Sequence, residues 1–142
     1  MLYNEIGLVQ PTDIKDFSLS TNNKIGVYSG YFNGDTSYID TPVVKPTMFT
    51  DDYTLSFWVY PLDDGRAIYF GDYSLPNGTL INFERKADGN FRYWHGGNPD
   101  KTVATLNAPK NEWTMLSITY TPGTMKFYKN GELKTTWEHT SS

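Results

Sequence analysis

The stretch WTMLSITYTPGTMKFYKNGEL, residues 113–133, decides the fold of this chain. Apolar and polar side chains alternate along it, as in strands that have one buried face and one solvent-facing face. Two turn signals interrupt the alternation. Pro122-Gly123 suits a type II turn, and Asn130-Gly131 is the residue pair that two-residue β-hairpins favour. The stretch therefore predicts three consecutive antiparallel strands.

The rest of the chain from Gly26 onward has the same pattern of alternating runs and turns. Short alternating runs are separated by segments rich in Gly, Pro, Asn and Asp, which suit chain reversals. Runs at this spacing, without a long helical period, predict an all-β antiparallel sandwich or barrel. One short helical turn is expected at 109–112, before Trp113. The expected strands are 27–32, 36–41, 53–60, 67–71, 79–85, 90–95, 101–106, 113–121, 124–129 and 132–137.

Residues 1–25 have weaker periodicity and many turn-forming residues. We interpret them as an N-terminal arm or edge that holds one or two short strands. Residues 26–142 are then one domain, because a chain of 142 residues is long enough to bury a core of its own.

The strand expected near the middle of the chain has two unlike faces. Leu55, Phe57 and Val59 form the uniformly apolar set, so we expect them to face the core. Trp58 and Tyr60 then lie among small hydroxyl side chains on the other face, a composition on which sugars stack. Alternatively, a loop or the N-terminal arm covers Trp58, since large aromatic side chains are usually mostly buried. The same rule directs five further side chains inward: Leu116, Ile118, Tyr120, Met125 and Phe127.

The composition excludes several classes of function. The net charge of −4 gives no basic footprint for nucleic acid and disfavours anionic membranes. No apolar stretch is long enough to span a bilayer, and the N-terminal residues do not have the pattern of a secretory signal. The chain has no cysteine, which rules out disulfides and a thiol nucleophile.

Five short motifs follow one another between residues 28 and 137. They are FNG at 32–34, YI at 38–39, SFWVYP at 56–61, WTMLSITY at 113–120 and YKNG at 128–131. Their order resembles that of laminin-G-like domains, the jelly rolls of the concanavalin A-type lectin and glucanase group. The resemblance implies a two-sheet antiparallel jelly-roll sandwich.

Domains of this family usually continue past the Asn-Gly hairpin into further strands, whereas this chain ends at TTWEHTSS, residues 135–142. We therefore expect the jelly roll to lack its usual C-terminal strands. An open apolar sheet edge promotes aggregation, so another chain, the N-terminal arm or a longer parent protein is expected to cover it.

No catalytic constellation is present in the sequence. Glucanases of related shape carry the string Glu-x-Asp-x-x-Glu, which directs two acids into one cleft, and this string does not occur here. His95 and His139 are too few and too distant in sequence to suggest a zinc triad. We expect no enzymatic activity.

Aromatic and guanidinium side chains are the candidate ligand-binding residues. Arg92 and Trp94 alternate onto one face of a strand, where a guanidinium and an indole could stack and donate to hydroxyl or carboxylate groups. Arg85 and Trp58 are expected on neighbouring strands. The predicted ligand-binding set is Trp58, Tyr60, Arg85, Arg92 and Trp94. The alternative is that these residues serve cross-strand packing and solubility.

Calcium is a possible cofactor, although none is required. Paired loop carboxylates supply the oxygen ligands that calcium prefers, and Asp63 with Asp64 is the candidate pair. The alternative is that both are turn residues, a position that aspartate favours.

Two functions are compatible with these observations. The resemblance implies a non-catalytic binding or adhesion module for a glycan or cell-surface polysaccharide, on a virion (tail, fibre or capsid decoration) or a bacterial surface protein. The alternative is a structural decoration or oligomerisation domain that binds protein and no sugar. Partners are accordingly glycans or other virion and surface-protein subunits, without nucleic acid or membrane insertion, and the expected location is extracellular or on a virion surface.

Overall fold

The computed structural model describes residues 13–40, 52–63, 65–71, 80–86, 88–95 and 101–138. The chain divides into two compact units, Met1–Val44 and Lys45–Ser142. The predicted boundary between an arm of residues 1–25 and a jelly roll from residue 26 stays a prediction.

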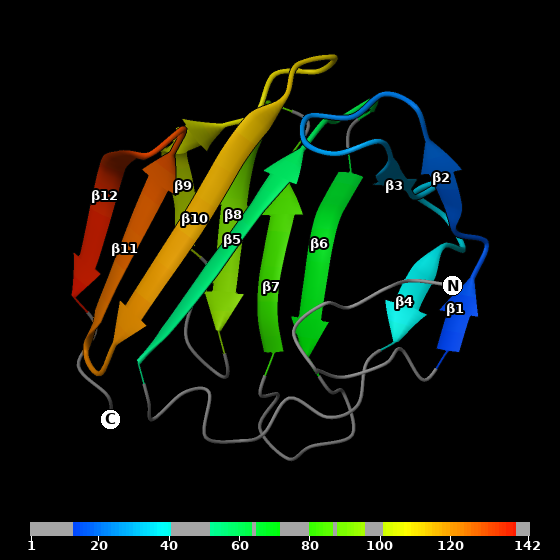
Figure 1. The fold of residues 1–142 in the computed structure, drawn as a ribbon. Helices are drawn as coiled ribbons and strands as arrows, with labels where there is room; N and C mark the ends of the chain where they lie inside the picture. Colours follow the sequence, from blue (N-terminus) through cyan, green and yellow to red (C-terminus); the bar gives the residue numbers. More distant parts are fainter. Residues whose placement is uncertain are drawn as a thin grey trace. The chain divides into compact units, whose positions relative to one another are not determined.

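The second unit is a pair of four-stranded antiparallel sheets. Figure 1 shows the sheet of order β12-β11-β10-β5 in front of the sheet of order β6-β7-β8-β9. The strands are β5 (Tyr53–Val59), β6 (Gly65–Gly71), β7 (Leu80–Arg85), β8 (Asn90–His95), β9 (Lys101–Asn107), β10 (Thr114–Thr121), β11 (Thr124–Lys129) and β12 (Glu132–Glu138). The predicted all-β, antiparallel, two-sheet architecture is confirmed, and every strand predicted in this part of the chain is present.

The core lies between these sheets. Strand β10 is central, because it pairs with β5 on one side and with β11 on the other. Leu116 is opposite Phe57, and Ile118 is opposite both Leu55 and Phe127. The predicted inward faces of β10 and β11 are buried, and Leu55, Phe57 and Val59 pack against them as predicted. The buried core residues are Phe91, Leu106, Ala108, Leu116, Ile118, Tyr120, Met125, Phe127 and Trp137.

The β11–β12 hairpin has the turn that its sequence predicts. Asn130 and Gly131 both adopt positive φ angles, 51° and 83°, which a type I′ turn requires. The Asn130 side chain adds a second function, because its Oδ1 accepts a hydrogen bond from the Met115 amide at 2.9 Å. The Asn130 amide in turn donates to the Met115 carbonyl at 2.8 Å. The hairpin tip is thereby tied to the start of β10.

Residues 109–112 do not form a helical turn, so this prediction is wrong. This segment is an irregular turn in which Asn111 adopts a left-handed φ of 60°. The Asn111 amide donates to the Pro61 carbonyl at 2.8 Å, so its hydrogen bond crosses to the chain after β5. A contact from a distant segment thus replaces the local bond that a helical turn would make.

The first unit contains two small antiparallel sheets. Strand β1 (Asp13–Lys15) pairs with β4 (Tyr38–Asp40), and β2 (Ser18–Ser20) pairs with β3 (Ser29–Tyr31). The loop between β3 and β4 is organised by Asn33, whose Oδ1 accepts hydrogen bonds from the amides of residues 35, 36 and 37. The expected strands 27–32 and 36–41 are present in shortened form.

Thr114 carries a buried hydroxyl that contributes no hydrogen bond within the described part of the chain. Its side chain is 0% exposed, and its Oγ1 has no partner there. A buried hydroxyl without a partner lowers stability by its desolvation penalty.

We expect Thr114→Val to raise the free energy of unfolding by about 1 kcal/mol in urea denaturation. Thr136→Val, the same change at an exposed position of β12, should change it by less than about 0.5 kcal/mol. A loss of stability in Thr114→Val would contradict this account.

Candidate functional site

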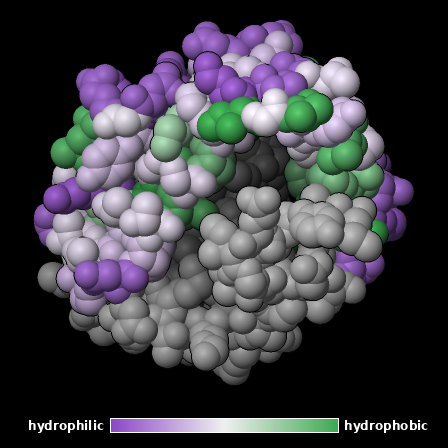
Figure 2. All heavy atoms as spheres, in the orientation of Figure 1, coloured by the Kyte–Doolittle hydropathy of each residue, from purple (hydrophilic) through white to green (hydrophobic). Residues whose placement is uncertain are grey.

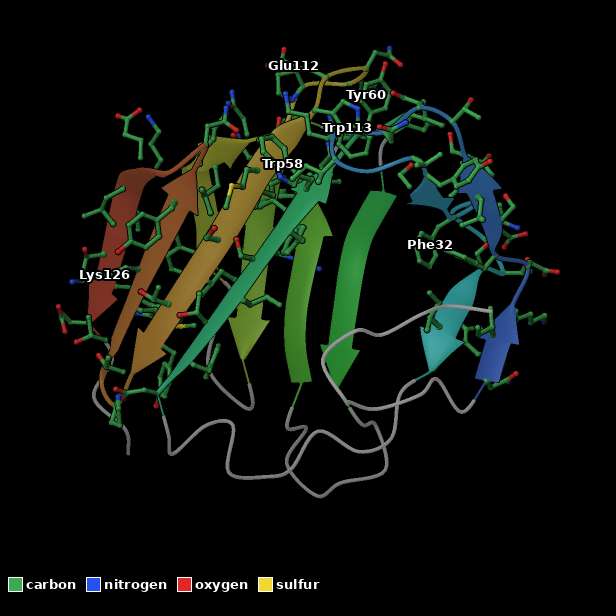
Figure 3. All side chains as sticks on the ribbon, in the orientation of Figure 1. Phe32, Trp58, Tyr60, Glu112, Trp113 and Lys126 are labelled. Atoms are coloured by element: carbon green, nitrogen blue, oxygen red, sulfur yellow. The ribbon has the colours of Figure 1, made fainter. Side chains whose placement is uncertain are left out.

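Three aromatic side chains gather at one end of the β12-β11-β10-β5 sheet. Trp58 and Tyr60 alternate with Val59, which packs on the core, so they project from the opposite face of the chain. The rings of Tyr60 and Trp113 lie 5.3 Å apart, centroid to centroid, and are tilted by 52°. Figure 3 shows Trp58 beside this pair. Each of the three residues is half-buried. We call Trp58, Tyr60 and Trp113 the aromatic cluster.

Contacts between two loops hold the aromatic cluster in place. The bond from the Asn111 amide to the Pro61 carbonyl joins the segments that carry Trp113 and Tyr60. Lys110 Nζ lies 3.5 Å from Asp63 Oδ1 across the same junction. The Asp63 side chain is 90% exposed, so this ion pair adds little stability. The hydrogen bond and the burial of Pro61 therefore contribute more to this junction than the ion pair does.

A row of small hydroxyl side chains continues the surface along β5 and β10. Ser56 lies opposite Ser117, and their Oγ atoms are hydrogen-bonded at 2.7 Å. Tyr128 of β11 is the next residue in this row, because it pairs with Ser117. Figure 2 shows mainly pale colours over these strands, as expected for Ser, Thr, Trp and Tyr, with purple hydrophilic groups at the margins. The side chains of Ser56 and Ser117 are short, and they lie between the larger rings of Trp58 and Tyr128.

The aromatic cluster contains two of the predicted ligand-binding residues. Trp58 and Tyr60 both belong to the aromatic cluster. Arg92 and Trp94 lie on β8 of the other sheet, and the Trp94 side chain is outside what the structure describes. The expectation that Arg85 and Trp58 lie on neighbouring strands is wrong, because β5 pairs with β10 whereas β7 pairs with β6 and β8. Alternation within a strand carries no information about which distant strand lies beside it.

Arg85 is buried and has a structural role. Its residue is 4% exposed, it lies opposite the buried Phe91, and its Nε donates to the Ala108 carbonyl at 2.9 Å. This bond connects the end of β7 with the segment that follows β9. We therefore leave Arg85 out of the candidate site.

Removal of the Arg85 guanidinium tests this assignment. We expect Arg85→Met to lower the free energy of unfolding by about 2 kcal/mol in urea denaturation, because the buried Ala108 carbonyl loses a charged donor. Lys126→Met removes a cation from an exposed position and should have an effect below about 0.5 kcal/mol. Unchanged stability of Arg85→Met would rule out the structural role.

The structure does not test calcium binding by the predicted pair, Asp63 and Asp64. Asp63 is exposed and faces Lys110, and Asp64 lies outside the described residues. Within the ranges that the structure describes, no group of three or more His, Cys, Asp and Glu residues could hold a metal ion. Calcium binding stays a prediction. No helix long and apolar enough to cross a membrane occurs in the described part either.

Sequence reasoning missed Trp113 and Tyr128 as candidate site residues. Trp113 was assigned only to the strand signature WTMLSITY. Alternation from the inward Leu116 assigns Met115 to the outer face, and Met115 lies opposite Trp58. Continuing the alternation to Trp113 would have placed it beside Tyr60. Placing Trp113 beside Tyr60 requires the β5–β10 register, which the sequence alone does not supply.

Comparison with known proteins agrees with this architecture. The laminin G family model described as the concanavalin A-like lectin/glucanases superfamily matches residues 33–142. No curated protein sequence matches the chain significantly. Among solved structures, the chain is similar to domain 4 of AbnA, a GH43 extracellular arabinanase from Geobacillus stearothermophilus, in complex with arabinotriose. The TM-score is 0.69 at 27% identity, over 89% of this chain and 60% of that one.

Proposed function

The chain belongs to the concanavalin A-like lectin/glucanase superfamily, and we propose that it is a non-catalytic module that binds carbohydrate on the aromatic cluster. The observation that carries this proposal is the convergence of Trp58, Tyr60 and Trp113 at one end of the sheet, where each residue is only partly buried. The module would recognise a glycan or cell-surface polysaccharide and leave its bonds intact.

The chemistry of the cluster suits a sugar. A pyranose or furanose ring has an apolar C–H face, which packs on a flat aromatic ring, and hydroxyl groups at its edge, which need hydrogen-bond partners. Aromatic side chains supply large contact area at little conformational cost. The Ser56 and Ser117 hydroxyls next to Trp58 can donate as well as accept, so they suit the edge of a ring stacked there.

The similar structure supports the ligand class. It is a domain of a carbohydrate-active enzyme and was solved with arabinotriose. Its similarity covers 89% of this chain, whereas this chain spans only 60% of that one, so only the shared part is compared. A short oligosaccharide is therefore the first ligand to test.

The absence of acids from β5 and β10 supports a non-catalytic role. Glycoside hydrolysis requires two carboxyl groups about 5–9.5 Å apart. The strands β5 and β10, YTLSFWV and TMLSITYT, contain no Asp or Glu. Glu112 is exposed in the loop before Trp113 (Figure 3), where it would supply one carboxylate at the rim of the cluster.

The setting that we propose is extracellular, on a secreted surface protein or a virion. The extracellular location is supported by the similar structure, which comes from an extracellular enzyme. The virion setting is what the resemblance to laminin-G-like domains implies, since such domains occur in phage structural proteins. Immunogold labelling of intact particles or cells with an antibody to this module would test it, and label confined to the cytoplasm would overturn it.

The aromatic cluster can be tested by single substitutions. We expect Trp58→Ala and Trp113→Ala each to weaken binding of arabinotriose or a longer arabinan by roughly 5- to 30-fold in calorimetric titration, equivalent to about 1–2 kcal/mol. The wild-type tryptophan fluorescence should also shift when the sugar binds.

Thr121→Ala provides the control, because Thr121 is exposed at the opposite end of β10. It should bind like the wild type, and circular dichroism should confirm that all variants are folded. Wild-type affinity in both tryptophan variants would overturn the site. Failure of the wild type to bind any saccharide in a glycan array would overturn the function.

A structural role in protein contact is the second candidate, and one observation favours it. Apolar side chains of the first unit are unusually exposed, with Ile25 at 72% and Val27 at 71%. Exposed apolar groups that gather in one segment are typical of contact surfaces. We would expect light scattering to show an oligomer that Val27→Asp dissociates. A monomeric wild type would argue against self-association.

A further inference from the structure

A polar cavity lies at the hairpin between β11 and β12. Its volume is about 170 Å³, and it is open to solvent. A cavity of this size holds on the order of ten water-sized spheres, which is comparable to a single sugar ring. The lining residues are Asn107, Lys129, Asn130, Glu132 and Lys134. We call this cavity the hairpin pocket.

The two sheets meet at the hairpin pocket through side chains. Lys129 Nζ of β11 donates to Asn107 Oδ1 at the end of β9, at 2.5 Å. Lys134 Nζ lies 2.6 Å from Glu132 Oε2, and the Lys134 side chain is only 26% exposed. Two lysines and one glutamate give the lining a formal charge of +1.

Hydrogen-bond donors outnumber acceptors in the pocket. Asn107 Oδ1 accepts from Lys129, and Asn130 Oδ1 accepts from the Met115 amide. Their side-chain NH₂ groups remain as donors. Each lysine ammonium carries three N–H groups, of which the contacts seen in the described part use one. A ligand that complements this lining is rich in acceptors and negatively charged.

The hairpin pocket is adjacent to the aromatic cluster. Asn130 is bonded to Met115 by both its amide and its side chain, and Met115 lies opposite Trp58. Neighbouring strands are about 4.8 Å apart, so this row from Trp58 to the hairpin spans about 10 Å. Figure 1 shows that β5, β9 and β11 all end at the same end of the sandwich, where β12 begins. Lys129 lies opposite the buried Leu116, so the pocket is on the core side of the hairpin, whereas Trp58 is on the outward side. An oligosaccharide stacked on Trp58 would reach the pocket by continuing past Met115 and over the hairpin tip.

We propose that the hairpin pocket binds the carboxylate of an acidic sugar residue, such as a uronate, within the glycan that stacks on the aromatic cluster. This inference rests on the proposed function and specifies its ligand class. Lys129 is the main determinant, because Lys134 is paired with Glu132, whereas the Lys129 ammonium contacts the neutral Asn107 side chain and so carries the charge that the lining has in excess.

The test compares an acidic oligosaccharide with its neutral counterpart. The probes are oligogalacturonate and the same oligosaccharide after reduction of its carboxyl groups, together with arabinotriose. We expect wild-type protein to bind the acidic probe roughly tenfold more tightly than the reduced one in calorimetric titration at low salt. The preference should decline with added sodium chloride, since part of the pocket is solvent-accessible.

Lys129→Gln tests the location, because glutamine retains hydrogen bonding without the charge and leaves the Lys134–Glu132 ion pair in place. It should lose the acidic preference while affinity for the reduced probe stays within about twofold of wild type. Lys126→Gln removes an exposed cation from the same sheet, away from the pocket, and should retain the preference (Figure 3). Urea denaturation should show that both variants are as stable as the wild type.

The outcomes separate this inference from the proposed function. Equal affinity for the acidic and reduced probes, with Trp58→Ala impairing both, would overturn the inference and leave the module a glycan binder. An acidic preference that survives Lys129→Gln would overturn the pocket as its location. Absence of binding to all three probes and to a glycan array would overturn the proposed function, and the inference with it.

Discussion

The alternation along β10 is the constraint on which the structure depends. Leu116, Ile118 and Tyr120 fill the space between the sheets, and their pairing with β5 and β11 sets the register of the front sheet. A slip of one residue would move all three into solvent and turn Met115 and Ser117 inward, so the register is strongly determined. The same register places Met115 beside Trp58 and Ser117 beside Ser56. The outward surface is thus a consequence of how the core is packed.

The strands and their faces could be predicted from sequence because both depend on local patterns. Period-two alternation and turn pairs such as Asn130-Gly131 act within a few residues, and the structure contains the strands that they predict. The segment 109–112 was mispredicted because its conformation depends on Pro61, about fifty residues away. Sequence shows that such a segment must turn, but its hydrogen-bond partner comes from the tertiary fold.

The candidate site could be predicted only in part, for the same reason. Trp58 and Tyr60 are two residues apart in the sequence, so alternation alone brought them together. Trp113 comes from the distant segment just before β10, and Arg85 was predicted to bind ligand although it serves the interior. Its guanidinium is tolerated there because a backbone carbonyl accepts its hydrogen bond. Recognition surfaces on sheets combine residues from several strands, and strand order is the information that a single sequence lacks.

The position of the hairpin tip has a consequence for evolution. Core packing depends on β10 and β11, and the reversal between strands depends on Asn130, which is bonded twice to Met115. Glu132 lies at the margin of the reversal, where a substitution leaves the packed layers intact. Divergence at this margin could therefore alter selectivity while the scaffold persists. Related modules would then be expected to differ most in sequence beside the bend and least along the interior of the central strand.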